Sequence, residues 1–456
     1  MGHNQIIHNE KGYALAAVLI VLVLITLIIG FMMMGFVMQN RFIQKDIHSM
    51  KARYLAEAGI WHFLSDRELW GDYSRTHFIV TTADSQKVFI SRNFYGGYWK
   101  VIATAEVGQS RKSIQSLIGE KPGDKFDHAV ILGDVRTPIV LTGSTLLTGP
   151  VISGQEGVQT RPFRGEQFSG SFSGEVTHSD SSALPLFNKE LIHNQFITYR
   201  SWIQSPPEHS FQIQTSTFNQ DSHYSLNKNI NVFYRTGNLH LNVGTRNSLP
   251  DSTTWIVSGN IKLTGDGDLG SFSTYIAADT IYVDGTLTGD HALFYASKMV
   301  HLNGNSQISA QLFSEGDILL EDKSYLRYPS LIYVKPQLNG SVKTGTIQLL
   351  DDVIVDGMVM LPDVDEGIVT EDKATVKIAD GALVRGAVYN TSRTEMSGTI
   401  YGSVLTNSFY FYISPTVYLN WLKDTRIEHH LRPQPFVVPI GFDENLQFEI
   451  LYWNEV

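Results

Sequence analysis

The feature that most constrains this chain is a long apolar run close to its N-terminus. Residues 13–38 read YALAAVLIVLVLITLIIGFMMMGFVM, and none of these 26 residues is charged. As a helix this run would be about 39 Å long, whereas the hydrocarbon core of a bilayer is about 30 Å thick. Apolar runs beyond about 18 residues are rarely the core helix of a globular domain. The sequence therefore predicts one membrane-spanning helix.

The helix is predicted to continue beyond the membrane. The apolar run exceeds the ~7–15 apolar residues of a secretory signal peptide, and no small-x-small cleavage motif follows it. Spacings of three and four residues then place a stripe of apolar side chains on one helix face. These are Ile43, Ile47, Met50, Tyr54, Ala58, Trp61 and Leu64. We expect one helix over residues 13–65, whose amphipathic second half packs on a following sheet.

Two motifs lie at the ends of this predicted helix. Glu10-Lys11-Gly12 stands directly before Tyr13, and residues 51–59 read KARYLAEAG. The first motif resembles the processing site of the type IV pilin family, and the second resembles the alanine-rich stretch of PilX-like minor pilins. The resemblance implies that residues 1–12 are a leader and that prepilin peptidase cuts between Gly12 and Tyr13 on the cytoplasmic side. A glycine suits that position because a protease must approach the backbone closely. Methylation of the new N-terminus is implied as well.

The resemblance also implies partners and a location. The helix would hold the chain in the bacterial inner membrane as a single-pass protein, and would later contact other pilin subunits in a filament outside the cell. We take Ala17, Thr26, Gly30 and Gly35 as the candidate assembly residues. Most pilins carry a glutamate at the mature position that is Ala17 here, where it neutralises the N-terminal amine of a neighbouring subunit. An unpaired buried ammonium is costly, so Ala17 indicates a minor or tip subunit.

Charge and composition bear on the alternatives. Four basic residues follow the apolar run and only Lys11 precedes it, so the positive-inside rule alone would place the large domain in the cytoplasm. A plain membrane-anchored protein therefore remains an alternative. The absence of cysteine excludes disulfide frameworks, thiolate metal sites and a cysteine nucleophile. A net charge of -10 argues against a nucleic-acid partner.

A small antiparallel sheet is predicted over residues 66–120. Strand-like runs cover 77–82, 87–93, 98–105 and 110–118, with turn residues at Gly108-Gln109. The last two runs resemble the hairpin that closes the globular head in PilX-like proteins. We expect this sheet to pack on the amphipathic half of the helix, and we take residues 121–124 as a linker.

Residues 125–408 contain a repeat. Four segments of similar pattern begin at Asn260, Thr280, Met299 and Asp317. Their second positions are Ile261, Ile281, Val300 and Ile318, which are 20, 19 and 18 residues apart. A period near 20 with three short strands is typical of a parallel β-helix, in which stacked coils share one core. The lack of a strict hexapeptide pattern favours a right-handed coil. An antiparallel sandwich is the competing interpretation.

Two segments depart from the repeat. Residues from about 155 to 229 are polar and irregular, and we expect a large insertion with a short helix. Residues 409–456 are rich in aromatic side chains, and we expect a C-terminal cap over the open end of the solenoid, because open strand edges must be covered. The predicted fold class is therefore α+β, with a long pilin helix, a small antiparallel sheet and a mainly-β right-handed solenoid.

Carboxylates are the candidate site residues of the repeat region. Calcium or a glycosidic bond would need them clustered on one face. The candidate metal ligands are Asp266, Asp268, Asp351, Asp352 and Asp356, and the dense carboxylate stretch of the last three continues through Asp363, Asp365 and Glu366. Each equally suits a turn, because aspartate hydrogen-bonds its own backbone there. We therefore expect no enzymatic activity and no cofactor, with calcium kept as a candidate.

The predicted function is that of a minor, tip-type subunit of a type IV pilus or a related secretion filament. The solenoid head would serve assembly priming or adhesion to a surface or carbohydrate ligand. A membrane-anchored scaffold resembling the bactofilin-type solenoids is the first alternative. A carbohydrate-active β-helix enzyme is the second.

Overall fold

The computed structural model describes residues 10–66, 75–81, 86–219, 231–244, 249–364, 367–442 and 447–455. The chain divides into two compact units. The first comprises Met1–Arg92, Val101–Ser116 and Trp453–Val456, and the second comprises Asn93–Lys100 and Leu117–Tyr452. Most of the predicted leader, residues 1–9, lies outside the described residues.

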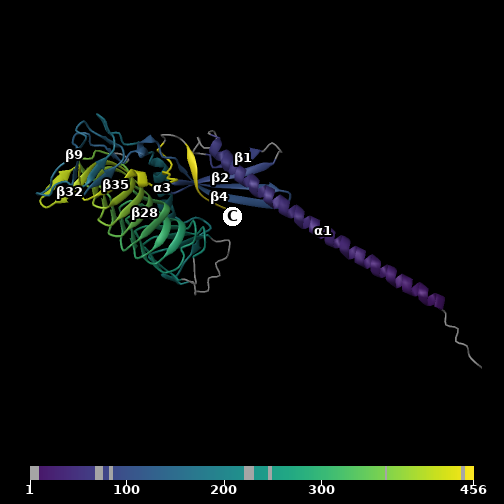
Figure 1. Ribbon diagram of the computed structural model, residues 1–456. Helices are drawn as coiled ribbons and strands as arrows, with labels where there is room; N and C mark the ends of the chain where they lie inside the picture. The colour runs from purple at the N-terminus through teal and green to yellow at the C-terminus, as the bar shows by residue number, and fades with distance from the viewer. Residues whose placement is uncertain are drawn as a thin grey trace, which may run out of the picture. The chain divides into compact units, whose positions relative to one another are not determined.

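One long helix dominates the first unit. Helix α1 (Glu10–Ser65) runs through 56 residues and is drawn in purple in Figure 1. Its sequence contains no proline, so no backbone donor is lost and no ring clashes with the preceding turn. At 1.5 Å per residue it is about 84 Å long. The prediction of one continuous helix through the apolar run and its amphipathic extension is confirmed.

The predicted hairpins form a small sheet. Its strands run in the order β1 (His77–Thr81), β2 (Lys87–Tyr95), β3 (Tyr98–Val107), β4 (Ser110–Glu120) and β36 (Phe448–Glu455). Strands β1 and β2 are antiparallel, with Phe78 opposite Ile90. The C-terminal strand β36 was not predicted here, since its residues were assigned to the cap. Sequence patterns report the strand but do not identify a partner more than 300 residues away.

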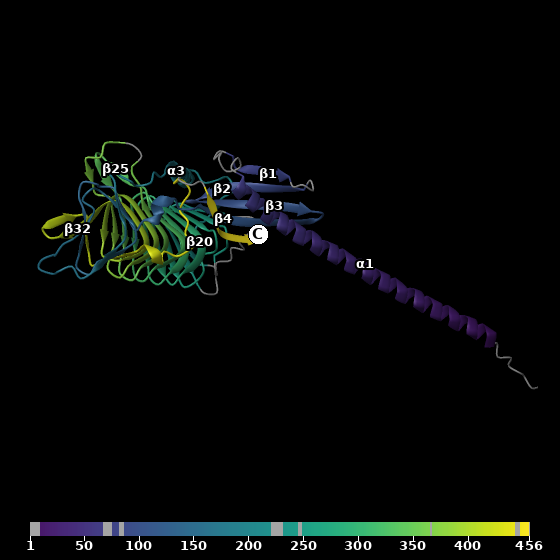
Figure 2. The same cartoon turned by 45° about the horizontal axis from the view of Figure 1, so that its top comes forward.

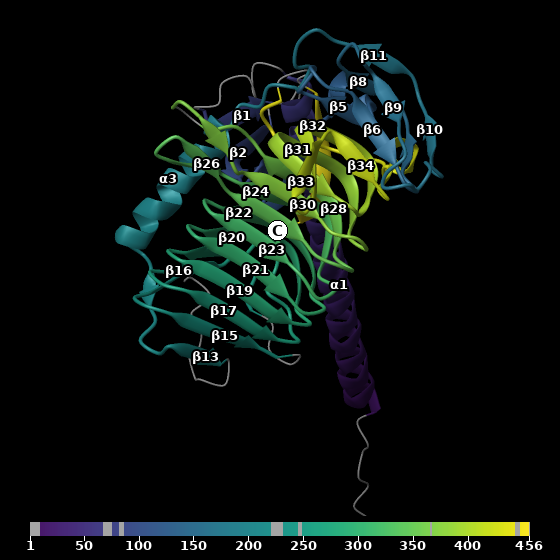
Figure 3. The same ribbon diagram turned by 90° about the vertical axis from the view of Figure 1, so that its left-hand side faces the viewer.

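The second unit is a large, mostly-β body in which parallel pairing dominates. Its strands form three ladders, each a series of parallel strands in which every strand pairs with the next. Figure 3 shows β15, β17, β19 and β21 of the first ladder as successive rungs. The first ladder contains β13 (Thr217–Asn219), β15 (Leu239–Val243), β17 (Ile261–Gly265), β19 (Thr280–Gly285), β21 (Met299–Asn303), β23 (Asp317–Leu320), β27 (Thr346–Leu349), β30 (Thr375–Ile378) and the distal parts of β31 (Leu383–Met396) and β32 (Thr399–Ile413).

The other two ladders share their longest strands. The second ladder contains the first parts of β20 (Thr288–Ala296), β22 (Gln307–Ser314), β24 (Tyr325–Val334), β28 (Ile354–Leu361), β31 and β32, and then β35 (Arg426–Glu428), β7 (Leu146–Thr148) and β10 (Ser171–Ser173). The third contains β12 (Phe211–Gln212), β14 (Val232–Arg235), β16 (Thr254–Val257), β18 (Thr274–Ala277), later parts of the same long strands, and β5 (Val130–Leu132), β8 (Val151–Ser153) and β11 (Val176–His178).

The register of the first ladder confirms the repeat alignment. Ile261 is the Cα partner of Ile281, Ile281 of Val300, and Val300 of Ile318. All four side chains are fully buried. Because strand side chains alternate between faces, this register keeps the same face buried from rung to rung. The parallel direction of these pairs excludes the antiparallel sandwich for this part of the chain.

The order of strands in space differs from their order in the chain. Strand β5 pairs with β32 and β7 pairs with β35, so the earliest strands of the body lie next to the latest ones. Strand β8 pairs in turn with β5. A separate sheet in the order β34-β6-β9 repeats this arrangement, with β34 (Trp421–Lys423), β6 (Ile139–Thr142) and β9 (Val158–Thr160) in parallel pairs.

The two irregular segments are placed differently from the prediction. Residues 155–229, expected as an insertion, contain the ladder strands β10, β11, β12 and β13 together with β9 and helix α3 (Glu190–Gln204); residues 220–229 lie outside the described residues. Residues 409–456, expected as an end cap, supply β34 to the separate β34-β6-β9 sheet, β35 to the second ladder between β32 and β7, and β36 to the small sheet. Strands of two or three residues carry too short a pattern to reveal their partners.

The remaining elements are short. Strand β33 (Thr416–Leu419) pairs antiparallel with the end of β32. Strands β25 (Gln337–Asn339), β26 (Val342–Thr344) and β29 (Glu371–Asp372) form a separate sheet. Two single-turn helices, η1 (Asp124–Asp127) and η2 (His429–Leu431), complete the described elements.

Two hydrophobic clusters hold the second unit together. One collects buried side chains from all three ladders, such as Ile281, Leu326 and Tyr275. The other lies on the opposite face of the third ladder, because neighbours such as Tyr275 and Ile276 point to different clusters. Helix α3 covers this second face, and its Phe196 contacts Tyr295, Phe313 and Tyr333 with ring centroids 5.0–6.0 Å apart.

Candidate assembly helix

The first half of α1 is exposed along its whole length in the part of the chain that the structure describes. Every residue from Tyr13 to Met38 is exposed, and Tyr13 itself is 85% exposed. By length and composition this helix can cross a membrane, and none of its most apolar segment is buried. Exposed apolar surface of this extent is unfavourable in water, so this half of the helix requires a lipid or protein environment.

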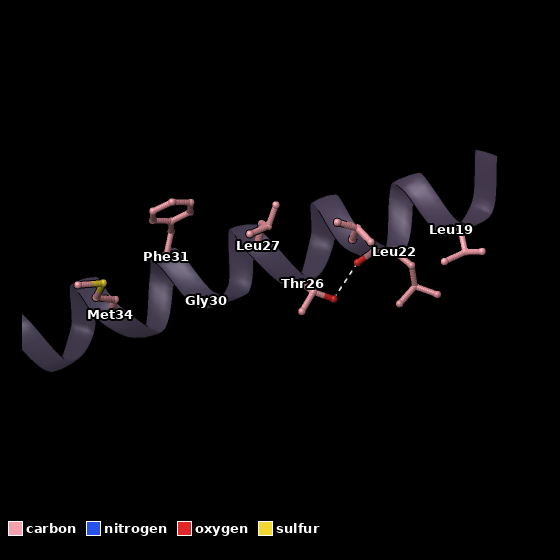
Figure 4. A pocket seen from close by; sticks show the side chains of 8 residues that line it. Leu19, Leu22, Thr26, Leu27, Gly30, Phe31 and Met34 are labelled. Atoms are coloured by element: carbon pink, nitrogen blue, oxygen red, sulfur yellow. Dashed lines mark hydrogen bonds between the residues drawn. The ribbon is translucent and has the colours of Figure 1, made fainter. Parts of the chain in front are cut away.

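Two of the candidate assembly residues, Thr26 and Gly30, lie in a shallow depression on the helix surface. Thr26 and Gly30 are four residues apart and therefore lie on one face, between Leu22 and Met34 in Figure 4. The Thr26 hydroxyl donates to the Leu22 carbonyl oxygen over 2.8 Å, so its polarity is satisfied within the helix. A Cβ at Gly30 or Gly35 would meet nothing within 4 Å. The chain's own packing therefore does not require these glycines.

The other predicted positions lie at the beginning of the helix. Gly12 falls inside the bounds of α1, directly before the exposed Tyr13. Ala17 is exposed one turn further along, and neither acidic nor basic side chains occur between it and Met38.

The second half of α1 packs on the small sheet through a face that combines small residues with Ile60 and Phe63. Ala52, Ala56 and Ile60 are fully buried, and the ring of Phe63 lies 5.9 Å from that of Phe78. A Cβ at Gly59 would lie only 2.6 Å from a methyl carbon of Val88. The alanine-rich stretch thus has a physical reason, because only small side chains let the helix approach the sheet this closely.

The predicted apolar stripe is not the face that packs on the sheet. Ile47 is 40% exposed, Met50 57%, Tyr54 62% and Trp61 58%. The expectation that this stripe covers the sheet is therefore wrong. Large apolar residues at helical spacing suggested a core face, but the sheet packs on the roughly opposite face, where alanine and glycine allow closer contact. The second half of α1 consequently has two apolar faces, one covered by the sheet and one exposed.

The turn between β3 and β4 abuts the helix where its polar part begins. Gly108, with φ at +60°, lies so near His48 that a Cβ would sit 2.6 Å from Nδ1. Arg41 and Lys45 line a groove between the helix and this turn. Lys45 follows Met38 by about 10 Å of helix, which corresponds to the headgroup level if residues 13–38 span the bilayer.

The candidate metal ligands near residue 266 belong to a turn. Asp268 accepts a hydrogen bond from the Gly270 amide over 2.7 Å and from the Thr288 hydroxyl over 3.3 Å. Asp266 lies in the same turn, where its amide donates to the Val243 carbonyl oxygen. Both observations match the turn-forming alternative for these aspartates.

The second candidate group is dispersed rather than gathered. Asp356 forms a two-point ion pair with Arg385, whose Nη2 lies 2.7 Å from Oδ2, and it accepts a bond from the Tyr325 hydroxyl. Asp351 and Asp352 precede the strand in a turn, Asp352 with φ at +65°. Asp365 and Glu366 lie outside the described residues. Within the described ranges, no three acidic or histidine side chains gather closely enough to hold a metal ion.

Outward-facing side chains on the first ladder were not predicted as a site. Lys373, Lys377 and Arg393 line a groove there together with Tyr410 and Tyr412. The alternation in 373–377 marks the lysines as outward-facing, but the tyrosines were assigned to the predicted cap. Only the parallel register brings residues 40 positions apart onto one surface.

Comparison with known proteins adds little. No family model matches the chain, and no curated protein is significantly similar to it. Among solved structures, the chain is similar to the competence-associated pilin ComZ from Thermus thermophilus, with 11% identity and a TM-score of 0.22. The comparison covers 90% of this chain and 97% of that chain. A likeness at this level does not establish a common fold.

Proposed function

We propose that this chain is a pilin-like subunit of a type IV pilus or a related secretion filament. The observation that carries the proposal is the second half of α1, with its two apolar faces. The face of Ala52, Ala56 and Gly59 is covered by the chain's own sheet, whereas the stripe from Ile47 to Trp61 is exposed. The first half of the helix is apolar on all sides, which suits a lipid bilayer. The second half has one exposed apolar face, which suits packing against helices of neighbouring subunits.

In this proposal the helix has two successive environments. The first half anchors the chain in the inner membrane until prepilin peptidase removes the leader between Gly12 and Tyr13. The helix then enters a bundle of pilin helices, where Thr26 and Gly30 permit close approach of a neighbour. Burying one large apolar side chain of the stripe contributes about 1.5–3 kcal/mol.

Ala17 bears on the position in the filament. A carboxylate at this point would neutralise the N-terminal amine of another subunit, and alanine cannot. An uncompensated ammonium in an apolar bundle is costly. We therefore place this subunit where no such pairing is needed, at the filament tip or in a priming complex.

We propose further that the three ladders are the faces of a right-handed parallel β-helix that forms the displayed head. The shared cluster of buried side chains from all three ladders supports this arrangement, as does the spacing of about 20 residues between partners such as Ile261 and Ile281. A head of this kind would be presented on the outside of the cell for adhesion.

A structural role without catalysis is part of the proposal. The carboxylates that an enzyme or a calcium site would use are engaged elsewhere, as with Asp356 on Arg385 and Asp268 on the Gly270 amide. Ion-paired and turn-capping carboxylates are poorly suited to general acid chemistry, because these partners stabilise the charged form.

Processing provides the test. Co-expression with a prepilin peptidase should shorten the full-length chain by twelve residues and leave a methylated Tyr13 as the N-terminus. Gly12→Ala should abolish this change, because a side chain obstructs close approach of the protease to the backbone. Intact-mass spectrometry of the membrane fraction measures both results.

Gly2→Ala is the matched control, since it changes a leader glycine away from the cleavage point and should be processed normally. An unshortened wild-type chain would count against the pilin proposal and favour a plain membrane-anchored scaffold. Processing of Gly12→Ala at the wild-type rate would show that the cut lies elsewhere.

A further inference from the structure

The outer face of the first ladder carries a strip that differs from the rest of this acidic chain. The register places Thr375 beside Arg393 and Lys377 beside Glu395, and Arg393 beside Ser408 on the next strand. Their neighbours Val376, Thr394 and Phe409 are buried, so the strip residues face outward by alternation. A groove of about 370 Å³ runs along the strip and is lined by Thr375, Lys377, Arg393, Glu395, Tyr410 and Tyr412. Its volume is within the ~300–1,000 Å³ range of ligand sites.

Arg393 is held in place without an acidic partner. Its Nε donates to the Thr375 hydroxyl over 3.0 Å, and its guanidinium carbon lies 4.8 Å from the ring centroid of Tyr410. Among the residues that the structure describes, no carboxylate lies within 4.0 Å of this guanidinium. The two terminal nitrogens are thus oriented and available for the two oxygens of a carboxylate.

The two lysines of the strip are only weakly neutralised. Lys377 lies 3.5 Å from Glu395 and Lys373 lies 3.2 Å from Glu371, and all four side chains are at least 38% exposed. Such exposed pairs exchange readily with a ligand because they contribute little on their own. The strip therefore combines three cations with two carboxylates in a chain whose net charge is -10.

An exposed apolar platform borders the cations. The hairpin of β32 and β33, at the left-hand end of the second unit in Figure 2, pairs Tyr410 with Leu419 and Tyr412 with Val417. Tyr412 is 50% exposed, Leu419 50% and Val417 41%. The opposite face of the hairpin is packed, since Phe411 lies 5.5 Å from Phe163 by ring centroids. The platform is thus supported from behind.

We propose that this strip binds an acidic polysaccharide, with a uronate carboxylate on Arg393 and an apolar sugar face on Tyr412. Both charge and shape support this ligand class. Sparse cations flanked by Glu371 and Glu395 match a polymer with spaced carboxylates, and the two acids can accept hydrogen bonds from sugar hydroxyls. The same acids repel a nucleic-acid backbone, which carries a charge on every residue. Thr346 and Gln348 in the groove offer further hydrogen bonds.

The proposal is tested on the full-length chain in detergent micelles. Isothermal titration calorimetry compares a galacturonate oligomer, its uncharged methyl-esterified form and a single-stranded oligodeoxynucleotide of the same charge. The acidic oligomer should bind. The methyl ester should bind at least about tenfold more weakly, because charge-assisted hydrogen bonds are lost.

Two variants locate the site, and one matched control excludes a general charge effect. Arg393→Gln should weaken binding of the galacturonate oligomer about tenfold or more. Tyr412→Ser should weaken it about threefold to tenfold. Lys262→Gln removes an outward lysine from β17 of the same ladder and should leave binding unchanged. Thermal unfolding of each variant checks that the fold is retained.

Several results would overturn the proposal. These are no binding of the acidic oligomer, equal binding of its methyl ester, or equal loss in Lys262→Gln and Arg393→Gln. Tighter binding of the oligodeoxynucleotide that is lost in Arg393→Gln would reassign the strip to nucleic acid. Because binding is measured on unassembled chain, its failure would not affect the processing test, and the reverse also holds.

Discussion

The first and third ladders of the second unit share one backbone arrangement and differ in their side chains. In the first ladder, strands alternate between buried and outward positions, as in β17, where Ile261 and Leu263 are buried and Lys262 is exposed. In the third ladder both faces are buried, as in β18, where Tyr275 and Ile276 belong to different clusters. Parallel pairing alone therefore does not determine the hydrophobic pattern of a strand.

The two ladders differ because other parts of the second unit cover the outer face of the third ladder. Helix α3 lies over the third ladder, and apolar residues such as Phe436 and Phe442 join it in the second cluster. Strands buried on both faces read as continuous apolar runs, and strands with one wet face alternate. In these two ladders, a strand with a continuous apolar run is therefore one that is buried on both faces.

Two tyrosines on consecutive strands should differ most in how much their substitution lowers the free energy of unfolding. Tyr295 on β20 is fully buried, with ring centroids 5.0 Å from Phe196 and 5.1 Å from Tyr199, whereas Tyr282 on β19 is 40% exposed. Tyr295→Ala should lower the free energy of unfolding by about 3–5 kcal/mol, and Tyr282→Ala by less than about 0.5 kcal/mol. Urea unfolding followed by tryptophan fluorescence measures both. Equal losses would show that the two ladders are equally covered.

Two ion pairs should differ by a smaller amount in how much each stabilises the chain. Arg200 on α3 donates to the nearly buried Glu315 over 2.7 Å, and the Tyr295 hydroxyl donates to the same carboxylate. Arg200→Met should destabilise the chain by about 1–3 kcal/mol, because a buried acceptor loses a charged donor. Lys298→Met removes the exposed pair with Asp279 and should cost about 0–1 kcal/mol. A greater loss for Lys298→Met would reverse the assignment of the covered face. Urea unfolding again provides the measurement.

The smallest effect concerns two histidines and pH. Burial lowers the pKa of His291 from 6.5 to about 4, and burial also lowers the pKa of the more exposed His240 on the first ladder. Below about pH 6.5 the unfolded state binds a proton that folded His291 does not accept until about pH 4. Stability is therefore lost as the pH falls through this window, by about 1 kcal/mol between about pH 7 and about pH 5.5.

His291→Asn should remove this part of the pH dependence, since asparagine does not titrate and tolerates the positive φ of +54° at this position. His240→Asn should remove less. Unfolding midpoints measured across the pH window test the comparison. A wild-type stability that does not fall between about pH 7 and about pH 5.5 would contradict the burial of His291.

Much of the fold could be predicted where patterns were long. The uncharged run in 13–38 and the absence of proline as far as Ser65 were sufficient for α1. The alignment of Ile261, Ile281, Val300 and Ile318 matched the register residue by residue. What could not be predicted was the covered face of α1, since Ala52, Ala56 and Gly59 carry almost no hydrophobic signal although all three are buried.

The candidate sites follow the same division. Local periodicity was sufficient to predict an apolar helix that needs a membrane or partner helices, and a spacing near 20 residues between paired strands. Contacts in the folded chain, by contrast, place β5 and β7 against β32 and β35, α3 over the third ladder, and Arg393 and Tyr410 in one groove. Those contacts join residues far apart in the chain, and no local period encodes which distant strand completes a buried face.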